Sequence, residues 1–185
     1  MRTTLKRIGA VAVCLTFAVC TASYAAYEES KKRVVTTDQI AAEIQENTRY
    51  LASKSLAKAK LLLEAYGDFA PFGAALFASG KVQFVWAVKP GEKTEGVNPV
   101  LVLNSVRRAL KSQADEGRIL GSAVIYRFLP KGDTRKNQIN VELEYLTGFA
   151  QVLGTQYEMT GAGYEYGEGA FKPYNPVVFT TEGSE

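Results

Sequence analysis

The chain contains no histidine, and its only two cysteines, Cys14 and Cys20, both lie within the first 20 residues. Ser-His-Asp and Cys-His catalytic sets need an imidazole base, so the sequence excludes them. Zinc sites built from His and Cys are excluded for the same reason. We therefore expect no cofactor and no metal site, and we assign no catalytic residue.

The N-terminal segment has the pattern of a secretory signal. Three basic residues precede the uncharged apolar run 8–20, and small residues stand at positions 23 and 25. This pattern predicts a signal peptide over 1–25, cleaved before Ala26. A 13-residue helix covers roughly 20 Å, short of the ~30 Å hydrocarbon core of a bilayer. An uncleaved anchor and a lipoprotein signal at Cys20 are the alternatives, and Val19 before Cys20 argues against the second.

Cleavage would change the charge balance of the chain. The whole sequence has 22 Lys+Arg against 19 Asp+Glu, and the leader carries three of the basic residues and no acidic one. The mature chain of 160 residues would be formally neutral, so a nucleic-acid partner is not expected. Both thiols would leave with the leader, and a hydrophobic core must hold the fold. We expect a periplasmic or secreted protein with no stable membrane insertion after cleavage.

Two helices are predicted. The polar residues 26–35 form a flexible lead-in, and no Gly or Pro interrupts 36–66, where apolar residues recur at three-and-four spacing. A second helix starts at Asn98 and Pro99, the favoured N-cap and first-turn residues, and ends at Gly117.

Five strands are predicted around these helices. Residues 73–88 form a hairpin with its turn at Ser79-Gly80, and three further strands follow over 119–128, 139–145 and 149–159. The order α-β-β-α-β-β-β is typical of an α+β domain. We predict one domain over 36–160, a single five-stranded, mainly antiparallel sheet with both helices on one face. Residues 161–185 are predicted to be an irregular Gly- and Tyr-rich tail.

Two charged pairs on these elements need an interpretation. Glu142 and Glu144 alternate with apolar residues, and two carboxylates about 7 Å apart approach the spacing of glycoside hydrolases. Alternation is also what a solvated sheet face requires, and we favour that interpretation. Arg107 and Arg108 point about 100° apart on a helix, which favours surface solvation or an internal salt bridge over a shared anion site.

The element order and the hairpin FGAALFASGKVQFVWAV are similar to the roadblock and profilin-like group of small α/β modules. That resemblance implies an interaction or regulatory module. The run 64–76 also resembles uncharacterised exported bacterial domains with a Gly-x-Phe-x-Pro-Phe-Gly passage, here 67–73, from which no activity carries over. The long tail after 159 departs from roadblock domains, which usually end with a helix there.

Two groups of residues are candidates for binding. Tyrosine is enriched at interfaces, and the tail offers four aromatic residues, Tyr164, Tyr166, Phe171 and Tyr174. The glycines of the tail resemble a phosphate loop only by composition, since no helix can start cleanly after them. The second candidate is a rim at Asp68 and Phe72, although packing of Phe72 in the core is the favoured interpretation of that residue. Trp86 is interpreted as a core residue, with ligand stacking as the alternative.

These observations favour an exported, non-enzymatic binding protein that recognises another protein, as an immunity protein, an inhibitor or an envelope adaptor. One alternative is a small-molecule binding or sensing domain. It would need a pocket of at least a few hundred Å³ between the sheet and the helices, lined by Phe and Tyr. The other is a histidine-free enzyme that uses Glu, Tyr, Lys or Arg.

Overall fold

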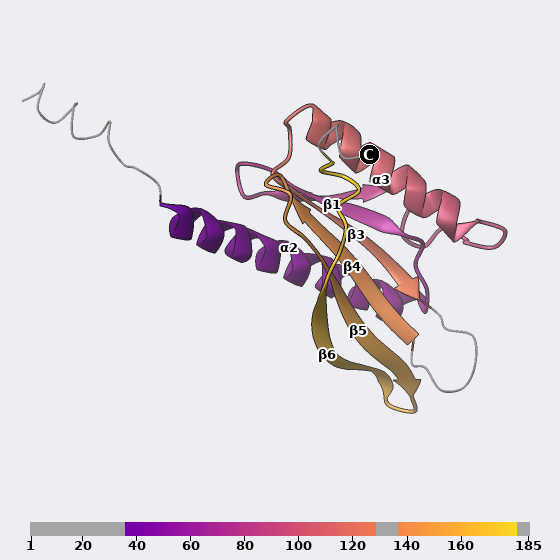
Figure 1. Ribbon diagram of the computed structural model, residues 1–185. Helices are drawn as coiled ribbons and strands as arrows, with labels where there is room; N and C mark the ends of the chain where they lie inside the picture. Colours follow the sequence, from indigo (N-terminus) through magenta and orange to yellow (C-terminus); the bar gives the residue numbers. More distant parts are fainter. Residues whose placement is uncertain (1–35, 129–136, 181–185) are drawn as a thin grey trace, which may run out of the picture. The chain divides into compact units, whose positions relative to one another are not determined.

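The computed structural model describes residues 36–128 and 137–180. The predicted signal peptide and lead-in lie outside these residues, as does the loop 129–136. The described residues form one six-stranded antiparallel sheet with two helices (Figure 1). The α+β class is confirmed, but the prediction of five strands is wrong.

Both helices lie where the sequence predicted them. Helix α2, Thr37–Tyr66, runs for 30 residues without a break. Helix α3, Pro99–Asp115, begins at Asn98, whose side chain accepts a hydrogen bond from the amide of Val100 at 3.0 Å. The predicted N-cap is therefore confirmed. Neither described helix is both long and apolar enough to cross a membrane.

The strands follow one another across the sheet with a single exchange of order. They are β1 (Phe72–Leu76), β2 (Val82–Trp86), β3 (Gly121–Phe128), β4 (Asn137–Tyr145), β5 (Ala150–Thr160) and β6 (Gly163–Pro173). Their order in the sheet is β2-β1-β3-β4-β5-β6, and every neighbouring pair is antiparallel. The predicted hairpin is confirmed as β1 and β2. The two edges of the sheet are β2 and β6.

The sixth strand comes from the segment predicted to be an irregular tail. Residues 163–173 pair with β5 along its whole length, with one bulge between Thr155 and Tyr157. Glycine weakens a strand, and this is why the segment was judged irregular. Tyr164 and Tyr166, two positions apart, pack against the main hydrophobic cluster and supply the burial that the glycines cannot.

The helices cover opposite faces of the sheet, not one face as predicted (Figure 1). Residues of α2 form a core cluster with Phe72, whereas α3 packs Val106 and Leu110 against the other face. Gly73 permits this close approach, because a Cβ there would lie 2.9 Å from Cγ1 of Val106 and 3.0 Å from Cδ1 of Leu110. Both faces of the central strands are therefore buried.

This cover changes the environment of the two glutamates of β4. Glu142 and Glu144 are each 3% exposed, so the predicted solvated face is wrong. Glu142 forms an ion pair with Arg107 through contacts of 2.6 and 3.1 Å, which confirms an internal salt bridge for that arginine. Glu144 accepts hydrogen bonds of 2.8–2.9 Å from three successive amides, at 177, 178 and 179.

The segment that follows β6 is thereby fixed to the α3 face. Three consecutive backbone amides make a concave site for an anion, and here the carboxylate of Glu144 occupies it. Val178 is fully buried in the cluster beneath α3. We call residues 174–180 the C-terminal strap. It closes the face that the sequence predicted to be open.

Candidate functional site

A cleft of about 310 Å³ opens between the C-terminal end of α2 and the loop that joins β2 to α3. It is lined by Leu62, Tyr66, Asp68, Phe69, Ala70, Trp86 and the loop residues 88–95. The passage 67–73, which the sequence marked as a possible rim, contributes one wall. The cleft thus joins two segments of the chain, 62–70 and 86–95, that are not adjacent in the sequence.

The floor of the cleft is aromatic and rigidly packed. The ring of Trp86 stacks on Phe72, with centroids 4.7 Å apart and an angle of 23° between the planes. Phe69 meets Phe72 edge-on at 5.6 Å. Phe72 is fully buried, so this predicted binding residue supports Trp86 from below and presents no surface to a partner. Trp86 is half-buried and lines the cleft.

The loop 88–95 is held in place from two sides. Within it, the amide of Lys89 donates to Oε2 of Glu92 at 2.9 Å, and the amide of Glu92 donates back to the carbonyl of Lys89. Gly91 has a φ of +81° and lies under the ring of Tyr66, where a Cβ would come within 3.2 Å of the ring. The loop is thus ordered before any ligand arrives, which lowers the entropy cost of binding.

Asp68 connects the cleft to the sheet. Its carboxylate forms an ion pair with Arg127 of β3 and accepts a hydrogen bond from Oγ1 of Thr94 at 3.2 Å. The guanidinium of Arg127 lies 5.8 Å from the centroid of the Phe69 ring. On the other side of Asp68 is a smaller cleft of about 160 Å³, which Arg127 and Val97 help to line. The predicted residue Asp68 therefore lines two adjoining clefts and positions the loop.

Two of the predicted tail residues pack on their own protein. The rings of Tyr164 and Tyr166 lie 6.3 Å apart and rest on Tyr157. The hydroxyl of Tyr164 donates to the carbonyl of Gly67, in the turn after α2, and that of Tyr166 donates to the carbonyl of Lys60 in α2, each at 3.4 Å. Burial and the nearby Glu64 carboxylate raise the pKa of the Tyr166 hydroxyl to about 12. These tyrosines fix β6 to α2.

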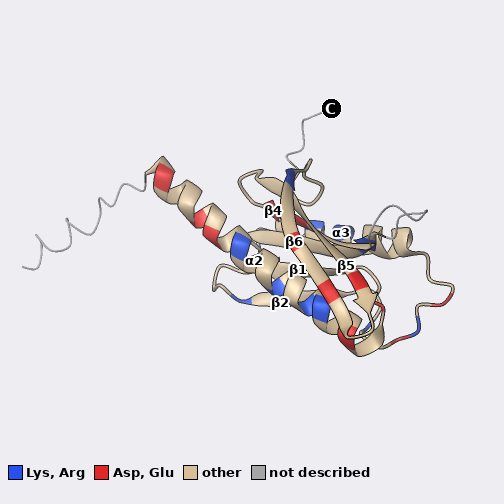
Figure 2. Ribbon diagram, turned by 90° about the horizontal axis from the view of Figure 1, so that it is seen from below, with Lys and Arg blue, Asp and Glu red and all other residues tan. Residues whose placement is uncertain are grey.

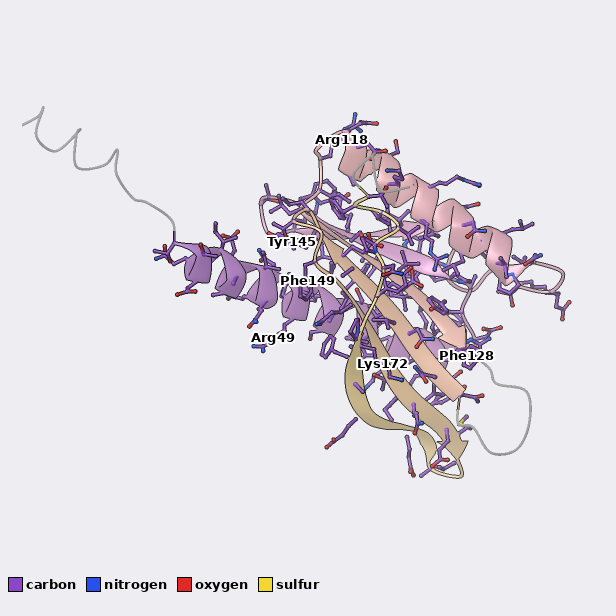
Figure 3. All side chains as sticks on the ribbon, in the orientation of Figure 1. Arg49, Arg118, Phe128, Tyr145, Phe149 and Lys172 are labelled. Atoms are coloured by element: carbon purple, nitrogen blue, oxygen red, sulfur yellow. The ribbon has the colours of Figure 1, made fainter. Side chains whose placement is uncertain are left out.

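The other two tail residues lie elsewhere. Phe171 is 48% exposed on β6 and lines a separate cleft of about 280 Å³ with Arg49 and Phe149, both labelled in Figure 3. Tyr174 lies on the α3 face, where Arg107 donates to its hydroxyl at 3.4 Å. Burial and the Glu142 carboxylate raise the pKa of Tyr174. The six predicted residues therefore occupy four regions, and only Asp68 and Phe72 lie at the main cleft.

A cluster of polar side chains lies between α3, the sheet and the C-terminal strap. It contains Arg107, Glu142, Tyr126 and Tyr174, and burial together with Glu142 raises the pKa of Tyr126 to about 12. Both carboxylate oxygens of Glu142 are engaged by Arg107, so the arrangement stabilises the α3 face and leaves the carboxylate no room to act as a base. In the described residues, no cluster of three or more His, Cys, Asp or Glu could hold a metal ion.

Sequence reasoning missed most of the cleft. Trp86 was interpreted as a core residue, with ligand stacking only as the alternative, and no site was assigned to the end of the helix 36–66 or to the segment between the hairpin and the second helix. The available signal was a tryptophan at the end of a strand, followed directly by a polar loop with a central glycine. In comparisons with family models, with characterised proteins and with solved structures, nothing matched this chain.

Proposed function

We propose that the protein is an exported, non-enzymatic binding protein and that the cleft beside Trp86 receives an apolar side chain of a partner protein. The observation that carries this proposal is the stack of Trp86 on Phe72, which forms a rigid aromatic floor open to a preformed cleft. Tryptophan in a packed, partly enclosed position is the most frequent type of binding hot spot. Export rests on the sequence pattern of the leader.

The rim of the cleft favours a protein partner. Loop 88–95 brings lysine and glutamate side chains around an apolar floor, the arrangement of a polar rim around a hydrophobic centre. The carboxylates of Asp68 and Glu92 are already bound to Arg127, to Thr94 and to the Lys89 amide. They order the rim and are not free to act on a substrate.

A small ligand in the same cleft is the second candidate. Ligand pockets measure roughly 300–1,000 Å³, and the volume of about 310 Å³ lies at the lower end of that range. Tyr66 and Phe69 are in the lining, as an aromatic ligand would require. Native mass spectrometry of protein purified from cells tests this candidate directly, because a retained small molecule would add its mass to the chain.

Site-specific cross-linking tests the partner. A photoreactive amino acid is placed at Lys89 on the rim or, as a control, at the exposed Met159 on β5, in cells that export the protein. We expect a defined covalent adduct from position 89 and none from position 159. The adduct should be lost with Trp86→Ala and with Tyr66→Ala, provided both variants unfold cooperatively. Equal adducts from both positions, or an adduct that persists in both variants, would remove the cleft from the proposal.

A further inference from the structure

The outer edge of β2 has backbone groups available for another strand. The amide of Phe77 donates to the carbonyl of Lys81 at 3.0 Å, which sets the alternation of the hairpin. By that alternation Gln83 and Val85 bond to β1, whereas Val82, Phe84 and Trp86 direct their N–H and C=O groups away from it. In the described part of the chain no strand lies beyond β2.

The hydrogen bonds of β1 agree with this assignment. Leu76 is opposite Val82, and its carbonyl accepts from the amide of Leu120, which leads into β3. The backbone of Leu76 therefore faces β3, and that of Val82 must face outward. Three residues of β2 thus offer a ladder of donors and acceptors, which is the template that strand addition uses.

The same edge leads directly to the cleft. The side chains of Val82, Phe84 and Trp86 all pack toward the α2 face of the sheet. Trp86 is the last residue of β2, and loop 88–95 of the cleft follows it. A strand added outside β2 and continued past Trp86 would bring a side chain to the aromatic floor.

The strand edge itself and the nearest turn of α2 carry lysines. No Asp or Glu occurs in α2 from Lys54 to Lys58, nor in the segment from Lys81 to Lys89, whereas Glu92 and Glu95 follow in loop 88–95. Figure 2 shows basic residues along the middle of α2, which lies beside β2. Lys58 is directly at the edge, with its Nζ 5.9 Å from the centroid of the Trp86 ring, and Lys54 lies one helical turn earlier. The opposite edge, β6, carries Glu165 and Glu168 together with Lys172.

We propose that the partner presents an extended, acidic segment that adds as a strand to the outer edge of β2 and places one large apolar side chain in the cleft. This inference rests on the proposed function, whose recognition site it extends. Backbone hydrogen bonds to Val82, Phe84 and Trp86 would supply affinity. The lysines along the edge would select for carboxylates and against basic segments.

Peptide selection and amide exchange test the proposal. Random twelve-residue peptides displayed on phage are selected against the protein as purified after export, and the most enriched peptide is synthesised. We expect Asp and Glu to be enriched, alternating with apolar residues, around one large apolar residue. On binding, the amides of Val82, Phe84 and Trp86 should exchange with deuterium at least about tenfold more slowly, while those of β6 stay unchanged.

Two matched pairs of reagents locate the contact. Two versions of the peptide are made, one N-methylated at the odd-numbered residues and the other at the even-numbered residues. Only one of the two should lose binding, because only every second amide of the added strand faces β2. Lys54→Glu combined with Lys58→Glu should weaken binding at least about tenfold, whereas Lys172→Glu on β6 should not. Lys172 is labelled in Figure 3 and serves as the control for charge alone.

The outcomes distinguish a failure of this inference from a failure of the proposed function. Strand addition would be overturned if no peptide is enriched, if both N-methylated peptides lose binding equally, or if amides of β6 become protected from exchange. The lysines of the β2 edge would then serve only to prevent aggregation. Enrichment of basic peptides would overturn the acidic partner. If the cross-link from position 89 survives any of these results, the cleft remains the recognition site. If that cross-link fails as well, the proposed function fails.

Discussion

At the scale of single residues, the burial of Glu144 leads to a clear energetic prediction. Glu144→Ala would leave three amides without an acceptor: the buried amide of Val178, at a cost of about 1–3 kcal/mol, and the part-buried amides of Val177 and Phe179, at a lower cost each. Leu143→Ala on the other face should cost roughly 2–5 kcal/mol. We therefore expect similar losses in urea unfolding of the two variants, where the sequence alone predicted a mild effect at Glu144. Glu168→Ala, at an exposed position, is the control and should stay within about 0.5 kcal/mol.

Tyr126 gives a prediction for alkaline pH. Burial, reinforced by the Glu142 carboxylate, raises the pKa of its hydroxyl to about 12 from the ordinary value of 10. The folded state therefore keeps a proton that the unfolded state loses, and this contribution to stability is full below pH 10 and falls as pH rises toward 12. The stability difference between wild type and Tyr126→Phe, measured by urea unfolding at several pH values, should move in favour of the variant above pH 10. Parallel pH profiles would contradict this assignment.

At the scale of elements, caps and turns predicted local structure well. Asn98 and Pro99 marked the start of α3, and Ser79-Gly80 marked the hairpin turn between β1 and β2. These signals are local, because the groups that satisfy the backbone lie within a few residues of it. The side of the sheet on which α3 lies depends on pairs that are distant in the sequence, such as Arg107 with Glu142. A strand with alternating glutamates has the same sequence pattern whether water or an arginine contacts the carboxylates.

The candidate site was predicted only in part, for a related reason. Asp68 was found because it lies in a dense, non-periodic passage, but its partners Arg127 and Thr94 are 59 and 26 positions away. Trp86 lines the cleft only because α2 and loop 88–95 converge on it. No local pattern encodes that convergence.

Strand β6 and the strap carry a prediction of their own. If residues 161–185 were the irregular tail that the sequence predicted, truncation after Thr160 would cause only a modest loss of stability. In the structure that truncation removes the partner strand of β5, the rings of Tyr164 and Tyr166, and all three amides that bind Glu144. We now expect the truncated chain to lose its cooperative urea transition and its near-ultraviolet circular dichroism. A chain that ends at Thr180 is the control and should keep both. A cooperative transition in the chain that ends at Thr160 would mean that β6 is dispensable.

At the scale of the whole molecule, export remains a prediction from the leader. The mature chain should begin at Ala26, and N-terminal sequencing of the exported protein tests this directly. A start at Cys20 with an acyl group would indicate a lipoprotein, and an intact Met1 would indicate that the leader is retained. A chain that begins at Ala26 has no cysteine, so its unfolding midpoint should be the same with and without a reducing agent.

The hydrogen bonds between Glu144 and the C-terminal strap can form only when the end of the chain has been made. The amides at 177–179 are synthesised after every strand of the sheet. Until they are made, the carboxylate of Glu144 near the end of β4 has none of these three donors, and the layer beneath α3 lacks Val178. A chain cut before residue 177 would lose all three donors and the Val178 side chain together, so we expect a protease to digest it faster than the chain that ends at Thr180.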